Sequence, residues 1–189
     1  TFAVTYVKKS YNDLDSVPWA VHMIEVLASK GVIENGDTAS YYPNEPITRG
    51  DYLAYLMRAL GLTAAFNSNF EDVDPEAHYY DEIGMARALG IAEGVDDRNY
   101  RPDATFTRQE AFALTARALR VAGVLDEQAP LADLTSFGDH GQLAGYAVAD
   151  TQALVALGLV VGDHNKMLLP LSNMTRAEAA ALIYRIYNM

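Results

Sequence analysis

The stretch Ile47-Thr48-Arg49-Gly50-Asp51 decides the fold, because it recurs twice in related form. Its counterparts are Phe106-Thr107-Arg108-Gln109-Glu110 and Met174-Thr175-Arg176-Ala177-Glu178. In each stretch a Thr stands three residues before an Asp or Glu, and helix-forming residues follow. This is the pattern of a capping box. In it the Thr side chain accepts a hydrogen bond from the amide of the third helical residue, and the acid at that residue accepts one from the Thr amide. We predict that a helix begins directly after the Thr of each stretch.

The residues before each stretch repeat in the same register. A glycine lies 18 residues before each Arg, at Gly31, Gly90 and Gly158, and a proline lies 12 residues after each glycine, at Pro43, Pro102 and Pro170. Ala20, Ile24 and Leu27 form one face of a helix that a left-handed Gly31 would end. Each copy is therefore a predicted helix–loop–helix. One such pair cannot bury its apolar face alone, so the fold class we predict is a single all-α unit of three packed repeats.

Three further positions recur in each copy. An aromatic-x-Asp pattern contributes Asp13, Asp72 and Asp139; an aromatic residue follows at Trp19, Tyr79 and Tyr146; and a second glycine lies in the loop at Gly36, Gly94 and Gly162. The predicted boundaries are 11–62, 68–122 and 134–189, with a linker over 123–133. In the third copy Asp139 is one residue out of register, and we expect a weakened first helix there.

Composition excludes several classes of protein. The chain has 189 residues, of which 50% are hydrophobic, so it is long and apolar enough to bury a core. Its net charge of −11 opposes binding to nucleic acid and to acidic membrane surfaces. No apolar run approaches the roughly 20 residues of a membrane helix. The absence of Cys excludes disulfides and thiolate metal sites. The β-rich stretch 1–7 is predicted to be the end of an upstream domain, with residues 1–10 as its tail.

The Arg after each Thr is the feature that helix formation does not explain. It would occupy the first helical position, where the helix dipole disfavours a cation by about 0.3–1 kcal/mol. Such an Arg, beside free helical N–H groups, makes a fork suited to a carboxylate or phosphate oxygen. The alternative is an ion pair with the aromatic-x-Asp of a neighbouring copy. The sequence leaves both explanations open.

This repeated order of aromatic-x-Asp, aromatic, Gly, Gly, Tyr-x-Pro and Thr-Arg-x-acid resembles the S-layer homology family, and three tandem modules match its usual number. The resemblance implies a spindle-like pseudo-trimer that anchors an extracellular protein non-covalently to the bacterial cell wall. The implied partner is an anionic secondary cell wall polysaccharide with pyruvylated N-acetylmannosamine, bound in grooves between modules. It also implies that Arg49, Arg108 and Arg176 meet the ketal carboxylate, that Gly36, Gly94 and Gly162 admit the sugar, and that Trp19, Tyr79 and Tyr146 line the grooves. Asp13, Asp72 and Asp139 belong to the same predicted site.

Other functions find less support in the residues. The sequence contains no motif of a nucleophile elbow, zinc protease, phosphate loop or dinucleotide site, and its four His lack ligand spacing. Two acidic runs, 71–74 and 96–99, do not follow the EF-hand pattern. We therefore predict no enzyme activity, no cofactor and no metal. Two alternatives stay open, a structural or oligomerising module without its own glycan site and a fragment of a carbohydrate-active enzyme.

Overall fold

The computed structural model describes residues 9–34, 39–126 and 128–189, and this part of the chain contains six α-helices, two short 3-10 helices and no strand. The strand predicted over 1–7 and the loop residue Gly36 lie outside the described residues. The predicted all-α class is confirmed. No helix in the described ranges is long and apolar enough to cross a membrane.

Each copy contributes two helices. The first helices are α1 (Val21–Ser29), α3 (Tyr80–Ala88) and α5 (Gly145–Ala156), and the second helices are α2 (Arg49–Leu60), α4 (Arg108–Val121) and α6 (Arg176–Tyr187). The 3-10 helices η1 (Leu14–Ser16) and η2 (His140–Gln142) precede α1 and α5. Each second helix begins directly after the predicted Thr.

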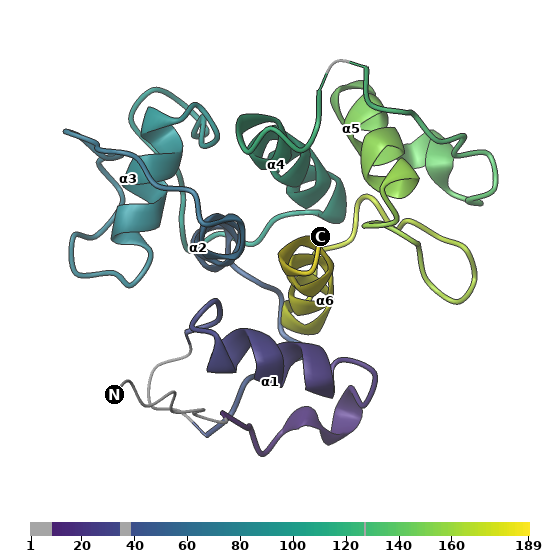
Figure 1. Ribbon diagram of the computed structural model, residues 1–189, viewed down its shortest axis with the longest axis horizontal. Coiled ribbons are helices and arrows are strands. Elements are labelled where there is room, and N and C mark those ends of the chain that lie inside the picture. The colour runs from purple at the N-terminus through teal and green to yellow at the C-terminus, as the bar shows by residue number, and fades with distance from the viewer. Residues whose placement is uncertain (1–8, 35–38, 127) are drawn as a thin grey trace, which may run out of the picture.

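The first helix of each copy packs on the second helix of another copy. Helix α3 contacts α2, α5 contacts α4, and α1 contacts α6, so the first and last helices of the chain meet. Figure 1 shows α2, α4 and α6 near the centre of the molecule with the first helices around them, and α2 contacts both of its central neighbours. The spindle-like, pseudo-trimeric shape stays a prediction.

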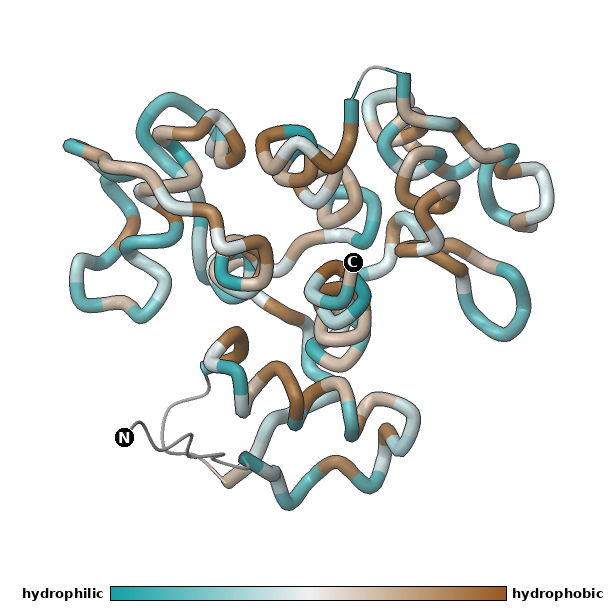
Figure 2. Tube along the Cα trace, in the orientation of Figure 1, coloured by the Kyte–Doolittle hydropathy of each residue, from teal (hydrophilic) through white to brown (hydrophobic). Residues whose placement is uncertain are grey.

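The core lies along the central helices. Their inward side chains are fully buried, including Tyr52, Leu56, Phe112, Leu119 and Ile183. Hydrophobic residues follow these helices and the inner sides of the outer ones, whereas hydrophilic residues gather in the outer loops (Figure 2). The glycines that end the first helices adopt the predicted left-handed conformation, with φ between 71° and 72° at Gly31, Gly90 and Gly158.

The expected weak first helix of the third copy is wrong. Helix α5 has 12 residues, whereas α1 and α3 have nine each. Its N-cap Ala144 is extended, and the Ala144 amide donates to the Gln109 side-chain oxygen at 2.9 Å. Helix α5 begins six residues after Asp139, whereas α1 and α3 begin eight residues after Asp13 and Asp72. The longer helix therefore takes up the extra residue, and Gln109 of the second copy binds at its start.

Candidate functional site

The second helices begin at junctions between copies. The amide of the second helical residue donates to the carbonyl of the repeated proline in another copy: Gly50 to Pro102 at 2.8 Å, Gln109 to Pro170 at 3.1 Å and Ala177 to Pro43 at 2.9 Å. The amides of the three arginines also donate to neighbouring loops, at Ala104, Ser172 and Glu45. The loops that contain Pro43, Pro102 and Pro170 are here called the proline loops. The expectation of free helical N–H groups beside each Arg is therefore wrong, because carbonyls of the proline loops in the other copies accept hydrogen bonds from these groups.

The side chains of the three arginines reach across the same junctions. Their Nε atoms donate to a carbonyl two residues before the repeated proline, from Arg49 to Tyr100 at 3.1 Å, from Arg108 to Leu168 at 2.7 Å and from Arg176 to Tyr41 at 2.9 Å. Each copy is thus tied to another through one guanidinium. This contact explains why an Arg stands where the helix dipole disfavours it.

The remaining guanidinium nitrogens differ among the copies. Arg108 pairs with Glu178 at 2.9 Å, and Arg176 pairs with Asp51 at 2.9 Å. Arg49 has no carboxylate within ion-pair distance in the described ranges and lies 4.8 Å from the Tyr100 ring centroid. The expected ion pair with the aromatic-x-Asp of a neighbouring copy is therefore wrong. The carboxylates that pair with Arg108 and Arg176 are the third residues of the neighbouring second helices.

The aspartates of the aromatic-x-Asp pattern hold the proline loops. Each carboxylate accepts two consecutive amides at 2.7–2.8 Å: Asp13 from Tyr41 and Tyr42, Asp72 from Tyr100 and Arg101, and Asp139 from Leu168 and Leu169. The second residue of each pair has φ between 53° and 59°, a conformation that costs free energy in a residue other than glycine. The carboxylates hold the loops in this shape, and with it the carbonyls that the arginines bind.

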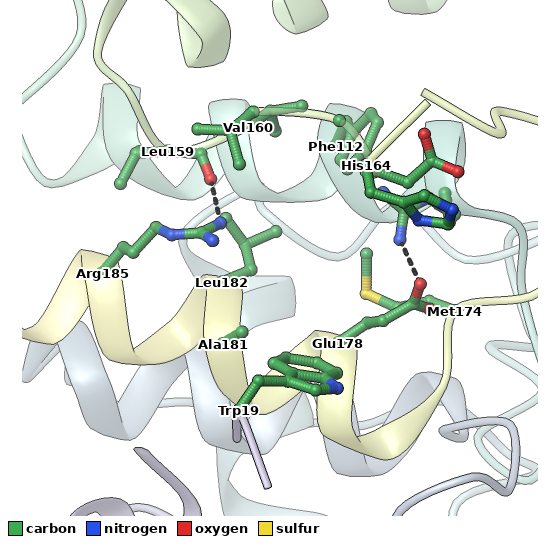
Figure 3. A pocket seen from close by; sticks show the side chains of 14 residues that line it. Trp19, Phe112, Leu159, Val160, His164, Met174, Glu178, Ala181, Leu182 and Arg185 are labelled. Atoms are coloured by element: carbon green, nitrogen blue, oxygen red, sulfur yellow. Dashed lines mark hydrogen bonds and ion pairs between the residues drawn. The ribbon is translucent and has the colours of Figure 1, made fainter. Parts of the chain in front are cut away.

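One cavity of about 440 Å³, here called the Trp19 groove, joins all three copies (Figure 3). It is lined by Trp19 from the first copy, by Arg108 and Phe112 from α4, and by the loop 159–164 and helix α6 of the third copy. Trp19 is 52% exposed despite its size. An exposed aromatic face beside guanidinium groups and an apolar floor suits an anionic sugar.

A second cavity of about 450 Å³, here called the Tyr146 groove, has the corresponding composition. It is lined by Arg49 of the first copy, Gly94, Tyr100 and Arg117 of the second, and Tyr146 of the third. Tyr146 is 60% exposed. Burial, and then the negative charge of Glu110, raise the pKa of Tyr146 above its ordinary value.

The third junction is built differently. Arg176 is only 8% exposed and contacts Asp51 and the Tyr55 hydroxyl, and Asp51 also binds His78 at 2.8 Å. Burial would raise the pKa of Asp51, but His78 and Arg176 lower it below its ordinary value. Burial raises the pKa of Tyr55 to about 12. Tyr55 stands where the other second helices carry Leu114 and Leu182, and it fills space between α2 and Arg176.

Tyr79 is not the exposed counterpart of Trp19. It is buried, donates to Asp103 at 2.7 Å, and lies so close to Gly50 that a Cβ there would approach its ring to 2.8 Å. His78 stands 12 residues before its glycine, as Trp19 and Tyr146 do before theirs. Counting 12 residues back from Gly90 selects His78, whereas the search for a large aromatic residue like Trp19 favoured Tyr79.

The loop glycines are required by the backbone. Gly94 and Gly162 have φ of 77° and 72°, and both line a groove. A Cβ at Gly94 would meet the Asn99 carbonyl at 2.6 Å, and one at Gly162 would meet the Phe137 ring at 2.8 Å. These positions exclude side chains whether or not a sugar binds beside them.

A second set of repeated arginines lies outside the motifs named above. Arg58, Arg117 and Arg185 each lie nine residues after the arginine that begins the helix, and the last two line the grooves. This regular spacing was the signal that could have found them. The described residues gather no group of three His, Asp or Glu that could hold a metal ion.

A chain of three helical repeats, tied at each junction by an Arg and a proline loop, belongs to the class of modular repeat proteins with grooves between modules. The model of the S-layer homology domain matches residues 10–53, 69–112 and 144–180, more than half of the chain. The chain therefore belongs to the S-layer homology domain family, as its repeated motifs predicted.

Relatives carry the same segment within much longer proteins. A protein named amylopullulanase from Thermoanaerobacterium thermosulfurigenes is 34% identical over 184 residues, which are 97% of this chain and 10% of that protein. "Exoglucanase XynX" of Acetivibrio thermocellus is 34% identical over 94% of this chain and 16% of its own length. "Surface-layer 125 kDa protein" of Lysinibacillus sphaericus is 28% identical over 92% of this chain and 14% of its own length. The chain spans less than a fifth of each.

Proposed function

We propose that this chain anchors a larger protein to the bacterial cell wall at the cell surface. Its ligand is an anionic secondary cell wall polysaccharide that carries pyruvylated N-acetylmannosamine, bound in the Trp19 and Tyr146 grooves. The observation that carries the proposal is that each groove combines an exposed aromatic ring of one copy with arginines of the other two. The part that this chain anchors is the upstream domain of the same polypeptide.

The chemistry of the grooves supports a sugar with a carboxylate. The face of Trp19 or Tyr146 can stack on the C–H face of a pyranose ring, and a planar guanidinium can hold a carboxylate at two points. Phe112 and Leu182 form an apolar floor in the Trp19 groove, on which an acetamido methyl group can lie. Because protein and polymer are both anionic, attraction must come from these local contacts.

The relatives support an attachment role rather than a catalytic one. Two bear the names of glycan-degrading enzymes and one that of a surface-layer protein, yet all three share this segment. Two enzymes and a surface-layer protein share no reaction by name, whereas an attachment segment would suit all three. We propose that the segment is the attachment part and is not itself an enzyme.

The test is sedimentation with purified wall sacculi. We expect the chain to pellet with native sacculi and to stay in the supernatant after the anionic polysaccharide has been chemically stripped. Trp19→Ala should weaken pelleting by about tenfold, or 1.4 kcal/mol, because the stacking face is lost. Val95→Ala, which changes an exposed side chain outside both grooves, is the control.

Two outcomes contradict the proposal. Equal pelleting with stripped sacculi would favour a structural or oligomerising module that has no glycan site. Release of soluble reducing sugar that increases with time would favour the enzyme fragment.

A further inference from the structure

The arginines near the ends of the second helices are neutralised in two copies and not in the third. Arg58 pairs with Glu34 at 3.0 Å and with Glu82 at 2.7 Å, and Arg117 pairs with Glu93 at 3.0 Å. In the described part of the chain Arg185 has no carboxylate within ion-pair distance, and one of its Nη atoms donates to the Leu159 carbonyl at 2.8 Å.

A single substitution between copies explains this difference. Glu34 and Glu93 each stand three residues after the glycine that ends the first helix, and the corresponding residue in the third copy is Val161. Val161 is 56% exposed and lines the Trp19 groove, as Arg185 does. The loop thus presents a methyl-bearing side chain where the other copies present a carboxylate.

The other acids of the Trp19 groove are already engaged. Glu178 pairs with Arg108 at 2.9 Å and accepts the Thr175 amide at 2.9 Å. Asp163 accepts the amides of Asn165 and Met167 at 2.9 and 2.8 Å, which closes the turn of its own loop. Arg108 and Arg185 both line the cavity, and Figure 3 shows the Arg185 guanidinium turned toward the Leu159 carbonyl.

A partly buried guanidinium without a counter-charge is unfavourable. Burial, and then the positive charge of Arg108, lower the pKa of Arg185. A carboxylate placed beside Arg185 would restore the charge balance that Glu93 gives to Arg117. Arg108, by contrast, already has both a carbonyl and a carboxylate partner.

We infer that Arg185 is the residue of the Trp19 groove that binds the carboxylate of a ligand. It can do so because Val161 stands where the other copies carry the Glu that pairs with the equivalent Arg. The inference rests on the proposed function for the identity of the ligand, an anionic sugar, and goes beyond it in naming the groove and the residue. Arg108, the first residue of α4, then has a structural role, because it binds the Leu168 carbonyl and Glu178 of the third copy. In the Tyr146 groove the arrangement is reversed, because Arg117 is neutralised and Arg49 has no carboxylate partner in the described residues.

The intrinsic fluorescence of the chain offers a direct test, because Trp19 is its only tryptophan and lies in this groove. The probe is the pyruvyl ketal of methyl N-acetylmannosaminide, compared with its uncharged methyl ester. We expect the ketal to change Trp19 fluorescence in the wild-type chain. Val161→Glu should weaken the ketal by more than tenfold, because it recreates the pair of Arg117 and Glu93, and it should change the weaker ester affinity little.

Three further variants separate charge from other effects. Val161→Gln has the size of Glu without its charge and should bind the ketal within about threefold of wild type. Val95→Glu adds the same charge outside the groove and should also leave binding unchanged. Arg185→Gln should weaken the ketal as Val161→Glu does. Thermal melting of all four variants shows whether each is folded at the temperature of the titration.

The outcomes distinguish this inference from the proposed function. Pelleting of wild-type chain with native sacculi, together with unchanged ketal affinity in Arg185→Gln, overturns the role of Arg185 and leaves wall anchoring in place. Equal weakening by Val161→Gln and Val161→Glu shows that bulk rather than charge matters, and also overturns it. Failure of the wild-type chain both to respond to the ketal and to pellet with sacculi overturns the two together.

Discussion

Asp51 makes the junction between the first and third copies differ from the other two, because of the partners that its carboxylate binds. Its counterparts Glu110 and Glu178 return to the Thr that caps their helix, at 2.6 and 2.9 Å. Asp51 is one methylene shorter, and its carboxylate binds His78 and Arg176 instead, so only half of the predicted capping box forms in the first copy. This makes Arg176 part of the structure of its junction.

We expect Asp51→Asn to lower the free energy of unfolding by about 3 kcal/mol at pH 7, because it breaks the buried ion pair between Asp51 and Arg176. The pKa of Asp51 is lower in the folded chain, so its contribution is present above about pH 4 and is lost as the pH falls through the folded pKa. Urea unfolding of both proteins at pH 7 and pH 3 measures the difference. A loss that is the same at both pH values would contradict this role.

Gly94 is held in its conformation by the backbone around it. Gly94→Ala should destabilise the fold by about 1–3 kcal/mol, because φ is positive and the new Cβ would meet two carbonyl oxygens at 2.6 Å. Gly141→Ala is the matched control, since nothing lies within 4 Å of the added atom. Thermal melting of the two variants should separate them, and equal midpoints would show that the loop adapts.

The proline loops are the elements that join the copies, and their aspartates differ in burial. Asp139 is only 3% exposed, whereas Asp72 is exposed, although both accept two loop amides. Water can replace a lost acceptor at the surface but not in the interior. The two loops therefore depend on their carboxylates to different degrees.

We expect Asp139→Ala to cost about 2–3 kcal/mol of stability, and Asp72→Ala clearly less. The two variants are matched, because each removes the same two hydrogen bonds from equivalent loops. Urea unfolding at neutral pH compares them. A larger loss for Asp72→Ala would mean that loop shape, rather than burial of the amides, sets the cost.

At the scale of the whole molecule, the packing of α1 on α6 joins the first copy to the third. A destabilising change in the first copy should therefore lower the stability of all three copies. Leu27→Ala removes a fully buried side chain from α1 and should lower the stability of the whole chain by about 2–5 kcal/mol. We expect Trp19 fluorescence and helical circular dichroism to give one coincident transition before and after the change. Two separate transitions would show that the copies unfold independently.

The net charge of −11 also acts on the whole molecule. Recognition of an anionic polymer then depends on local contacts within the grooves, and we expect affinity for the wall polysaccharide to fall less than about tenfold between 50 and 300 mM salt. Calorimetric titration at several salt concentrations measures this. A steep decrease, as for proteins that neutralise many phosphates, would indicate nonspecific ion exchange.

The local patterns of the sequence were sufficient for the starts of the second helices and the ends of the first helices, because caps and left-handed glycines act within a few residues of the chain. Thr107 and Gly90 could be placed in this way, and the spaced repeat identified the family. The partners of the arginines could not be placed, because each lies across a junction with another copy, 51 or more residues away. Only tertiary packing decided that Arg176 is buried against Tyr55 and that Tyr79 lies on Gly50 while His78 is exposed. It also decided that Arg185 has no carboxylate partner among the described residues. Spacing along a chain sets which residues share a helix, whereas burial and counter-charge depend on what the rest of the chain brings beside them.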